Sequence, residues 1–136
     1  MGVIAEVIRI EPNGAISFGN YLVKEKQKVG DFEAGGDIYK VKTHNELTRI
    51  EKNSKLLLET VPGSAIHNFS LTDSLTVFEA EGGGDTQITL EMEPEMSYNI
   101  FVGGKKTGES KSNRSGKVSF SAELASVPQE VKIEKL

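Results

Sequence analysis

Strict alternation of apolar and polar residues in the second half of the chain constrains the fold most strongly. In the segment KVSFSAEL, Val118, Phe120, Ala122 and Leu124 alternate with polar residues. Because successive side chains of a strand point to opposite faces, this segment is expected to be a strand with one face on a core and one in water. The same pattern recurs at 86–92, 97–102 and 130–136.

Turn residues separate these segments at intervals of about ten residues, as in Gly103-Gly104 and Ser115-Gly116. Short strands at that spacing are typical of an all-β sandwich or barrel. Helical periodicity is nowhere comparable. We therefore predict an all-β, antiparallel β-sandwich with at most one short helix.

The first half of the chain carries weaker strand signals. Asn13-Gly14 stands between the apolar segments 3–10 and 15–18, and Asn-Gly is a strong hairpin signal. Further strands are expected at 28–34, 37–43 and 55–61.

Residues 43–53 are compatible with two structures. Thr43 and Glu46 have the spacing of a capping box, which favours a helix. The alternative is a hairpin that reverses through 51–54, and the β-branched residues Thr48 and Ile50 favour it.

We expect a single domain over residues 1–136. An alternative subdivision has N-terminal β hairpins at 1–61 and a β-sandwich at 64–136, so that two small β lobes meet near 61–65. Pro62 and Gly63 suit a type II turn at that joint. The expected core consists of Ile88, Leu90, Tyr98, Ile100, Val118, Phe120, Leu124 and Val131.

Two similar segments, DFEAGGD at 31–37 and FEAEGGGD at 78–85, raise the question of a metal site. Neither has the oxygen density or spacing of a calcium loop. We expect the glycines to supply positive φ in hairpin turns and the aspartates to bond the turn backbone. No metal or cofactor is predicted, and Asp37, Asp85, Glu91 and Glu93 are retained as weak metal candidates.

Two histidines are present, and no Gly-x-Ser-x-Gly nucleophile elbow accompanies them. We expect His67 to be half exposed at the start of a strand and His44 to be solvated in a polar turn. A small hydrolase using His67 with acidic residues at 91–95 is the alternative.

Exposed aromatic residues offer an interaction surface. If Tyr98, Ile100 and Val102 point inward, Phe101 points outward, which suggests a partner. Tyr21 and Tyr39 are the candidates for stacking on a sugar, although the chain has no tryptophan.

The charge of the chain and the targeting signals in its sequence limit the classes of partner that we expect. The net charge is −4, only three arginines occur, and there is no cysteine. A phosphate-binding surface is therefore not expected, nor is a disulfide or thiolate site. No basic leader with an apolar run and no stretch of about 18 apolar residues is present. We expect neither nucleic acid nor membrane as partner, and a cytoplasmic location, or a secreted or cell-surface one if a leader was removed.

The run SYNIFVGGKKTGESKSNRSGKVSFSAEL at 97–124 resembles the closing strands of immunoglobulin-like β-sandwich accessory modules, and the resemblance extends over about 64–136. It implies a noncatalytic role. We therefore expect a structural or protein-interaction module. Self-association into a homo-oligomer is compatible with this expectation. A carbohydrate-binding or cell-surface accessory module is the alternative.

Overall fold

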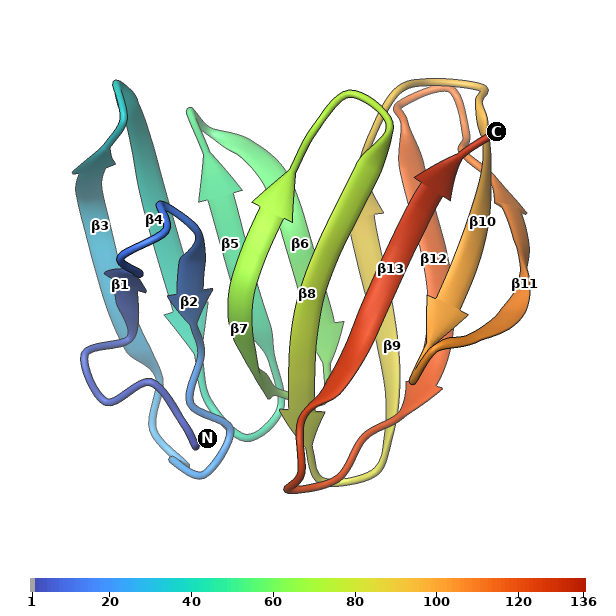
Figure 1. The fold of residues 1–136 in the computed structure, drawn as a ribbon. Coiled ribbons are helices and arrows are strands. Elements are labelled where there is room, and N and C mark those ends of the chain that lie inside the picture. The colour runs from blue at the N-terminus through green and yellow to red at the C-terminus, as the bar shows by residue number, and fades with distance from the viewer. Residues whose placement is uncertain (1) are drawn as a thin grey trace.

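The computed structural model describes residues 2–136 and confirms an all-β fold without helices in that range. Two antiparallel sheets pack face to face (Figure 1). The strands are β1 (Ile8–Ile10), β2 (Ile16–Phe18), β3 (Gln27–Ala34), β4 (Asp37–Thr43), β5 (Thr48–Lys52), β6 (Lys55–Val61), β7 (Ser64–Leu71), β8 (Leu75–Gly82), β9 (Asp85–Glu91), β10 (Ser97–Val102), β11 (Lys105–Lys111), β12 (Lys117–Glu123) and β13 (Gln129–Lys135).

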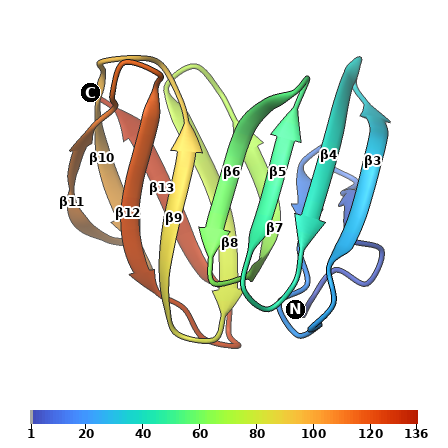
Figure 2. The same ribbon diagram turned by 180° about the vertical axis from the view of Figure 1, so that it is seen from behind.

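The two sheets draw on strands from the whole chain. Sheet A has seven strands in the order β1-β2-β7-β8-β13-β10-β11. Sheet B, seen from behind in Figure 2, has six strands in the order β12-β9-β6-β5-β4-β3. Hairpin connections account for most neighbours, while β9 and β12 leave their chain neighbours and join sheet B. The joint at 61–65 therefore links strands of two shared sheets, since β6 pairs with β9 and β2 pairs with β7, and not two separate lobes.

The core lies between the sheets and contains the predicted residues. Seven of the eight are buried, and Phe120 is partly buried against the cluster. Phe18, Phe69 and Phe78 form an aromatic row on sheet A, with ring centroids 6.4 and 5.6 Å apart. Alternation thus places the apolar face as the sequence predicts.

The hairpin turns follow their residue types. Gly14 has φ +87° in the β1–β2 turn, although β1 begins only at Ile8. Residues 43–53 form the hairpin and not the helix, with Asn53 and Ser54 at φ +52° and +69°. Two successive left-handed residues match the type I′ geometry of a two-residue hairpin loop.

The glycine-rich turns match the prediction in part. Gly35 and Gly36 have positive φ, and in the second segment Gly84 does as well. Gly82 instead packs closely on Leu124.

The predicted type II turn at Pro62-Gly63 is wrong, since Gly63 does not have positive φ and the Val61–Pro62 peptide bond is cis. Glycine is required at 63 for another reason. A Cβ there would overlap the carbonyl oxygen of His44.

Candidate functional site

Four loops gather at one end of the sandwich, the lower end in Figure 1. We call them the loop end, and they comprise residues 19–26, 44–47, 61–63 and 124–128. Backbone hydrogen bonds join them: Asn45 N donates to Val23 O at 2.8 Å, and Gly63 N donates to Asn45 O at 3.1 Å. The end of β8 is bonded to the fourth loop through Gly82 N and Ala125 O at 3.0 Å. The main chain therefore joins the first three loops to one another and the fourth loop to β8.

Exposed aliphatic side chains lie on two of these loops and at the last residue of β6. Leu22 is 69% exposed, Val61 48% and Val127 72%. Single exposed apolar residues are common on protein surfaces. Three branched ones at the same end of the sandwich form a candidate contact surface.

Loop 19–26 is fastened to sheet A by a buried polar cluster. The Tyr21 hydroxyl donates to Glu81 Oε2 at 3.1 Å, and His67 Nε2 lies 2.7 Å from Glu81 Oε1. The His67 and Glu81 side chains are only 2% and 3% exposed. Burial is the larger cause, and the hydrogen bond to Glu81 the next, of a raised pKa of Tyr21. Its hydroxyl therefore remains a donor at neutral pH.

The same loop is fastened to sheet B by buried hydroxyl groups. Asn20 N donates to Thr43 Oγ1 at 2.9 Å, and the Thr43 and Thr48 hydroxyls are 2.8 Å apart. Thr48 donates its single proton to Ser64 O at 2.9 Å, so Thr43 must be the donor in the pair. This chain of bonds joins the loop to the start of β7.

The structure corrects the predictions for both histidines. His67 is 2% exposed, not half exposed, and its acidic partner is Glu81 and not the 91–95 group. His44 is 8% exposed, not solvated, and its backbone N bonds Leu47 O at 2.8 Å. Both residues hold neighbouring segments in place.

A signal for the partner of His67 was present in the sequence. In the β7–β8 hairpin, His67 is in register with Glu79, and Glu81 is the next residue of β8 on the same face. A turn placed at 72–74 predicts that His67 lies opposite Glu79, because residues equally distant from a hairpin turn face each other. Glu81 is then expected beside His67 on the same face.

Ser17, on the strand beside β7, belongs to a separate set of bonds. Its hydroxyl donates to Glu11 Oε2 at 3.1 Å and accepts from Asn68 N at 3.1 Å. Ser17 is fully buried, and Arg9 Nε bonds the other oxygen of Glu11 at 2.9 Å. Its bonds therefore run to Glu11 and the β7 backbone, which links β2 to β7.

The weak metal candidates lie apart. Asp37 accepts from Asn53 Nδ2 at 2.9 Å, which holds the pKa of Asp37 below its ordinary value. Glu93 bonds Lys135 Nζ at 2.6 Å. Glu91 ends β9 opposite Lys117, and Asp85 begins that strand at its other end. Within residues 2–136 no group of three or more His, Asp or Glu could hold a metal ion.

The three aromatic candidates lie on different surfaces. Phe101 is half-buried on sheet A, with Lys132 Nζ 5.4 Å from its ring centroid. Tyr21 bonds Glu81 at the loop end, while Tyr39 is 7% exposed and lines a slot between the sheets. Tyr21 and Tyr39 therefore do not share a face.

Comparison with protein families, with curated proteins and with solved structures finds no match to this chain. Over the residues that the structure describes, no helix is long and apolar enough to cross a membrane.

Replacing Tyr21 by phenylalanine is expected to loosen loop 19–26 while leaving the sandwich intact. The change removes the donor to Glu81 and is expected to lower the free energy of unfolding by about 1 kcal/mol. Amide hydrogen exchange at Leu22 and Val23 should accelerate, while exchange in β9 and β12 stays unchanged. Equal protection of the loop in both proteins would contradict the fastening role of Tyr21.

Proposed function

We propose that this chain is a noncatalytic protein-interaction module whose loop end docks on an apolar surface of a partner protein. The observation that carries the proposal is the exposure of Leu22, Val61 and Val127 on one set of loops.

The bonding of these loops favours such a role. Asn45 joins loop 19–26 to loop 61–63 through its backbone N and O, and Tyr21 and Asn20 fasten loop 19–26 to both sheets. A partner that covers the aliphatic side chains therefore pays little to order the backbone beneath them. Loops clustered at the end of a sandwich also serve recognition in immunoglobulin-like domains.

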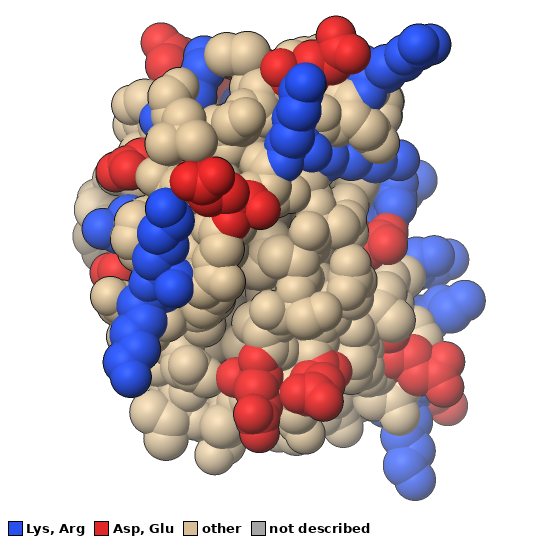
Figure 3. Space-filling view, turned by 90° about the vertical axis from the view of Figure 1, so that its right-hand side faces the viewer, with Lys and Arg blue, Asp and Glu red and all other residues tan. Residues whose placement is uncertain are grey.

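Two of the four edge strands, β11 and β3, are less suited to binding a partner strand. β11 pairs only with β10 and carries Lys105, Lys106, Glu109 and Lys111. Figure 3 shows this side of the molecule, where charged side chains project around an uncharged central area. In sheet B, the edge strand β3 has an irregularity at Asp31, where φ is +53°. Charges and bulges on edge strands discourage strand addition.

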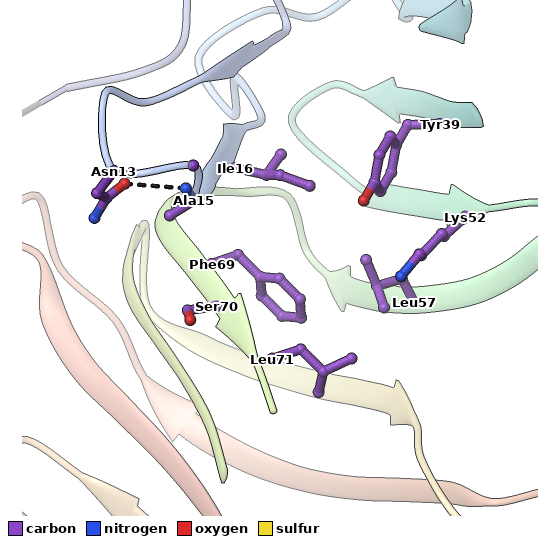
Figure 4. A pocket seen from close by; sticks show the side chains of 10 residues that line it. Asn13, Ala15, Ile16, Tyr39, Lys52, Leu57, Phe69, Ser70 and Leu71 are labelled. Carbon is purple, nitrogen blue, oxygen red and sulfur yellow. Dashed lines mark hydrogen bonds between the residues drawn. The ribbon is translucent and has the colours of Figure 1, made fainter. Parts of the chain in front are cut away.

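The buried polar groups support a structural role in place of a chemical one. Neither His67 nor Glu81 lines the slot beside Tyr39 (Figure 4) or any of four other surface cavities formed by residues 2–136. Both side chains bind other parts of the same fold. The separation of Tyr21 from Tyr39 likewise favours a protein partner over a glycan.

The test compares capture of partner proteins by the wild-type chain and by charged variants. Leu22→Lys and Val127→Lys place a charge on the loop end, and Ile38→Lys, at a residue 46% exposed on β4, is the matched control. Substitutions at such exposed positions change stability by about 0.5 kcal/mol or less. We expect partners retained by the wild type and by Ile38→Lys to be lost at least about tenfold from both loop-end variants.

Two readouts make the outcome decisive. Light scattering of the purified chain shows whether the partner is a second copy, in which case the wild type dimerises and Leu22→Lys does not. Retention of the same partners by all three variants would overturn the proposal.

A further inference from the structure

Four strands form the edges of the two sheets, and three of them are protected against pairing with another chain. β1 has only 3 residues. β3 is interrupted at Asp31, and β11 carries Lys105, Lys106 and Lys111. Short length, bulges and lysines are the usual means by which edge strands avoid association. The fourth edge strand, β12, has a different character.

β12 presents a regular edge with a neutral centre. All 7 of its residues pair with β9 without a register shift. Between Lys117 and Glu123 the strand has no charged residue, no glycine and no proline. On the side of the molecule where β11 and β12 lie, charged side chains surround an uncharged central area (Figure 3). A charged or polar rim around a neutral centre is the usual layout of a protein interface.

The main-chain groups of alternate residues in β12 face away from β9. Lys117 N donates to Asn113 Oδ1 at 3.0 Å, and Lys117 O accepts from Asn113 N at 3.1 Å. Because residues alternate along an antiparallel pair, Ser119, Ser121 and Glu123 direct their main-chain groups to the same side. No strand follows β12 on this side in the order of sheet B. The N–H and C=O groups of Ser119 and Ser121 are therefore left without a strand partner.

We propose that β12 pairs antiparallel with β12 of a second copy of this chain, about a two-fold axis at Ser121. Asn113 occupies the position beside Lys117, so a partner strand fits only along residues 119–123. Two copies of this stretch pair symmetrically when Ser121 faces Ser121 of the second copy. Sheet B of one copy then continues into sheet B of the other.

The ends of this pairing fit the course of the chain. Ser119 faces Glu123 of the second copy, and the carbonyl oxygen of Glu123 exchanges its 2.7 Å bond with the Gln129 side chain for the main chain of Ser119. Beyond Glu123 the chain leaves sheet B for β13 in sheet A. This departure leaves room beside the strand end for Asn113 of the second copy.

Side chains on both faces of β12 favour a second copy as the occupant. On the outer face, the exposed Lys117 of one copy lies diagonal to the exposed Glu123 of the other, within reach of long side chains. On the inner face, Phe120 lies opposite Ala122 of the second copy. Phe120 is only partly buried against the core cluster, because β12 is the last strand of its sheet. The second copy covers its ring.

The test is analytical ultracentrifugation of the purified chain from about 10 µM to about 1 mM, the range expected for a small interface. The wild type should form a dimer. Ser121→Lys sets like charges opposite each other at the two-fold axis and should raise the dissociation constant at least about tenfold. Gln87→Lys is the matched control, since Gln87 is exposed in register with Ser121 on β9 and both variants lose the same 3.1 Å bond. It should dimerise like the wild type.

Charge reversal tests the register. Lys117→Glu and Glu123→Lys each place like charges on the diagonal and should weaken the dimer about threefold to tenfold. An equal mixture of the two variants should form a heterodimer about as tight as the wild-type dimer, because every diagonal then joins opposite charges.

Amide hydrogen exchange locates the interface without any substitution. The amides of Ser119 and Ser121 should gain protection as the concentration of the wild type rises. A chain that stays monomeric up to about 1 mM, or edge amides that stay unprotected in a dimer, would overturn the proposal. A dimer that Leu22→Lys abolishes and Ser121→Lys retains would also overturn it, because that dimer forms through the loop end. Loss of the β12 dimer alone does not affect the loop-end proposal.

Discussion

Replacement of Glu81 by alanine is expected to lower the free energy of unfolding by about 3 kcal/mol. The Glu81 carboxylate accepts from Tyr21 and pairs with His67 at 2.7 Å. His67 is 2% exposed, so its imidazole cannot turn to water when the carboxylate is lost. Urea denaturation should show a lower midpoint with an unchanged slope, because the same surface is exposed on unfolding.

Two further variants test whether the loss of stability is specific to the Glu81 carboxylate. Glu79 precedes Glu81 on the same face of β8 and is half-buried, so Glu79→Ala removes a less buried carboxylate from the same strand face and should cost less than about 1 kcal/mol. Glu81→Gln keeps an acceptor for His67 and should fall between the two. A loss below about 1 kcal/mol in Glu81→Ala would show that the buried pair does not fasten loop 19–26.

The strands could be predicted because alternation depends only on residues that are adjacent in the sequence. Val118 and Ile88 each belong to an alternating segment, and the alternation does not depend on which sheet that segment joins. Both residues are buried as expected. Which sheet receives β9 and β12 depends on pairing between distant segments. For that reason the sandwich was predictable, but the mixing of both chain halves in both sheets was not.

The candidate site was predictable only in part. Alternation puts His67 on the outer face of sheet A, which suggests partial exposure, but the structure buries it beside Glu81, the carboxylate to which loop 19–26 is bonded. The loop brings Tyr21 to Glu81, a partner 60 positions away in the sequence. No periodicity encodes such a contact. Tyr39 likewise faces the slot because the two sheets leave space there, which depends on packing and not on its neighbours in sequence.

Replacement of Gly19 by alanine is expected to cost about 3 kcal/mol, through two effects that add. Gly19 has φ +103°, where a Cβ is strained, and that Cβ would overlap the carbonyl oxygen of Ser64. The overlap is with the backbone of β7, which cannot move without disturbing the Thr48 bonds to Ser64. Strain at positive φ accounts for about 1–2 kcal/mol and the overlap for about 1–3 kcal/mol.

Gly14 separates the two effects. It has a similar φ, +87°, yet no atom lies within 4 Å of a Cβ built there. Gly14→Ala should therefore cost only the strain, about 1 kcal/mol. The difference between the two variants, measured by urea denaturation, reports how closely loop 19–26 is packed on β7. Equal losses would mean that β7 can move away from the loop, and then the packing of Gly19 against Ser64 would not hold the loop end rigid.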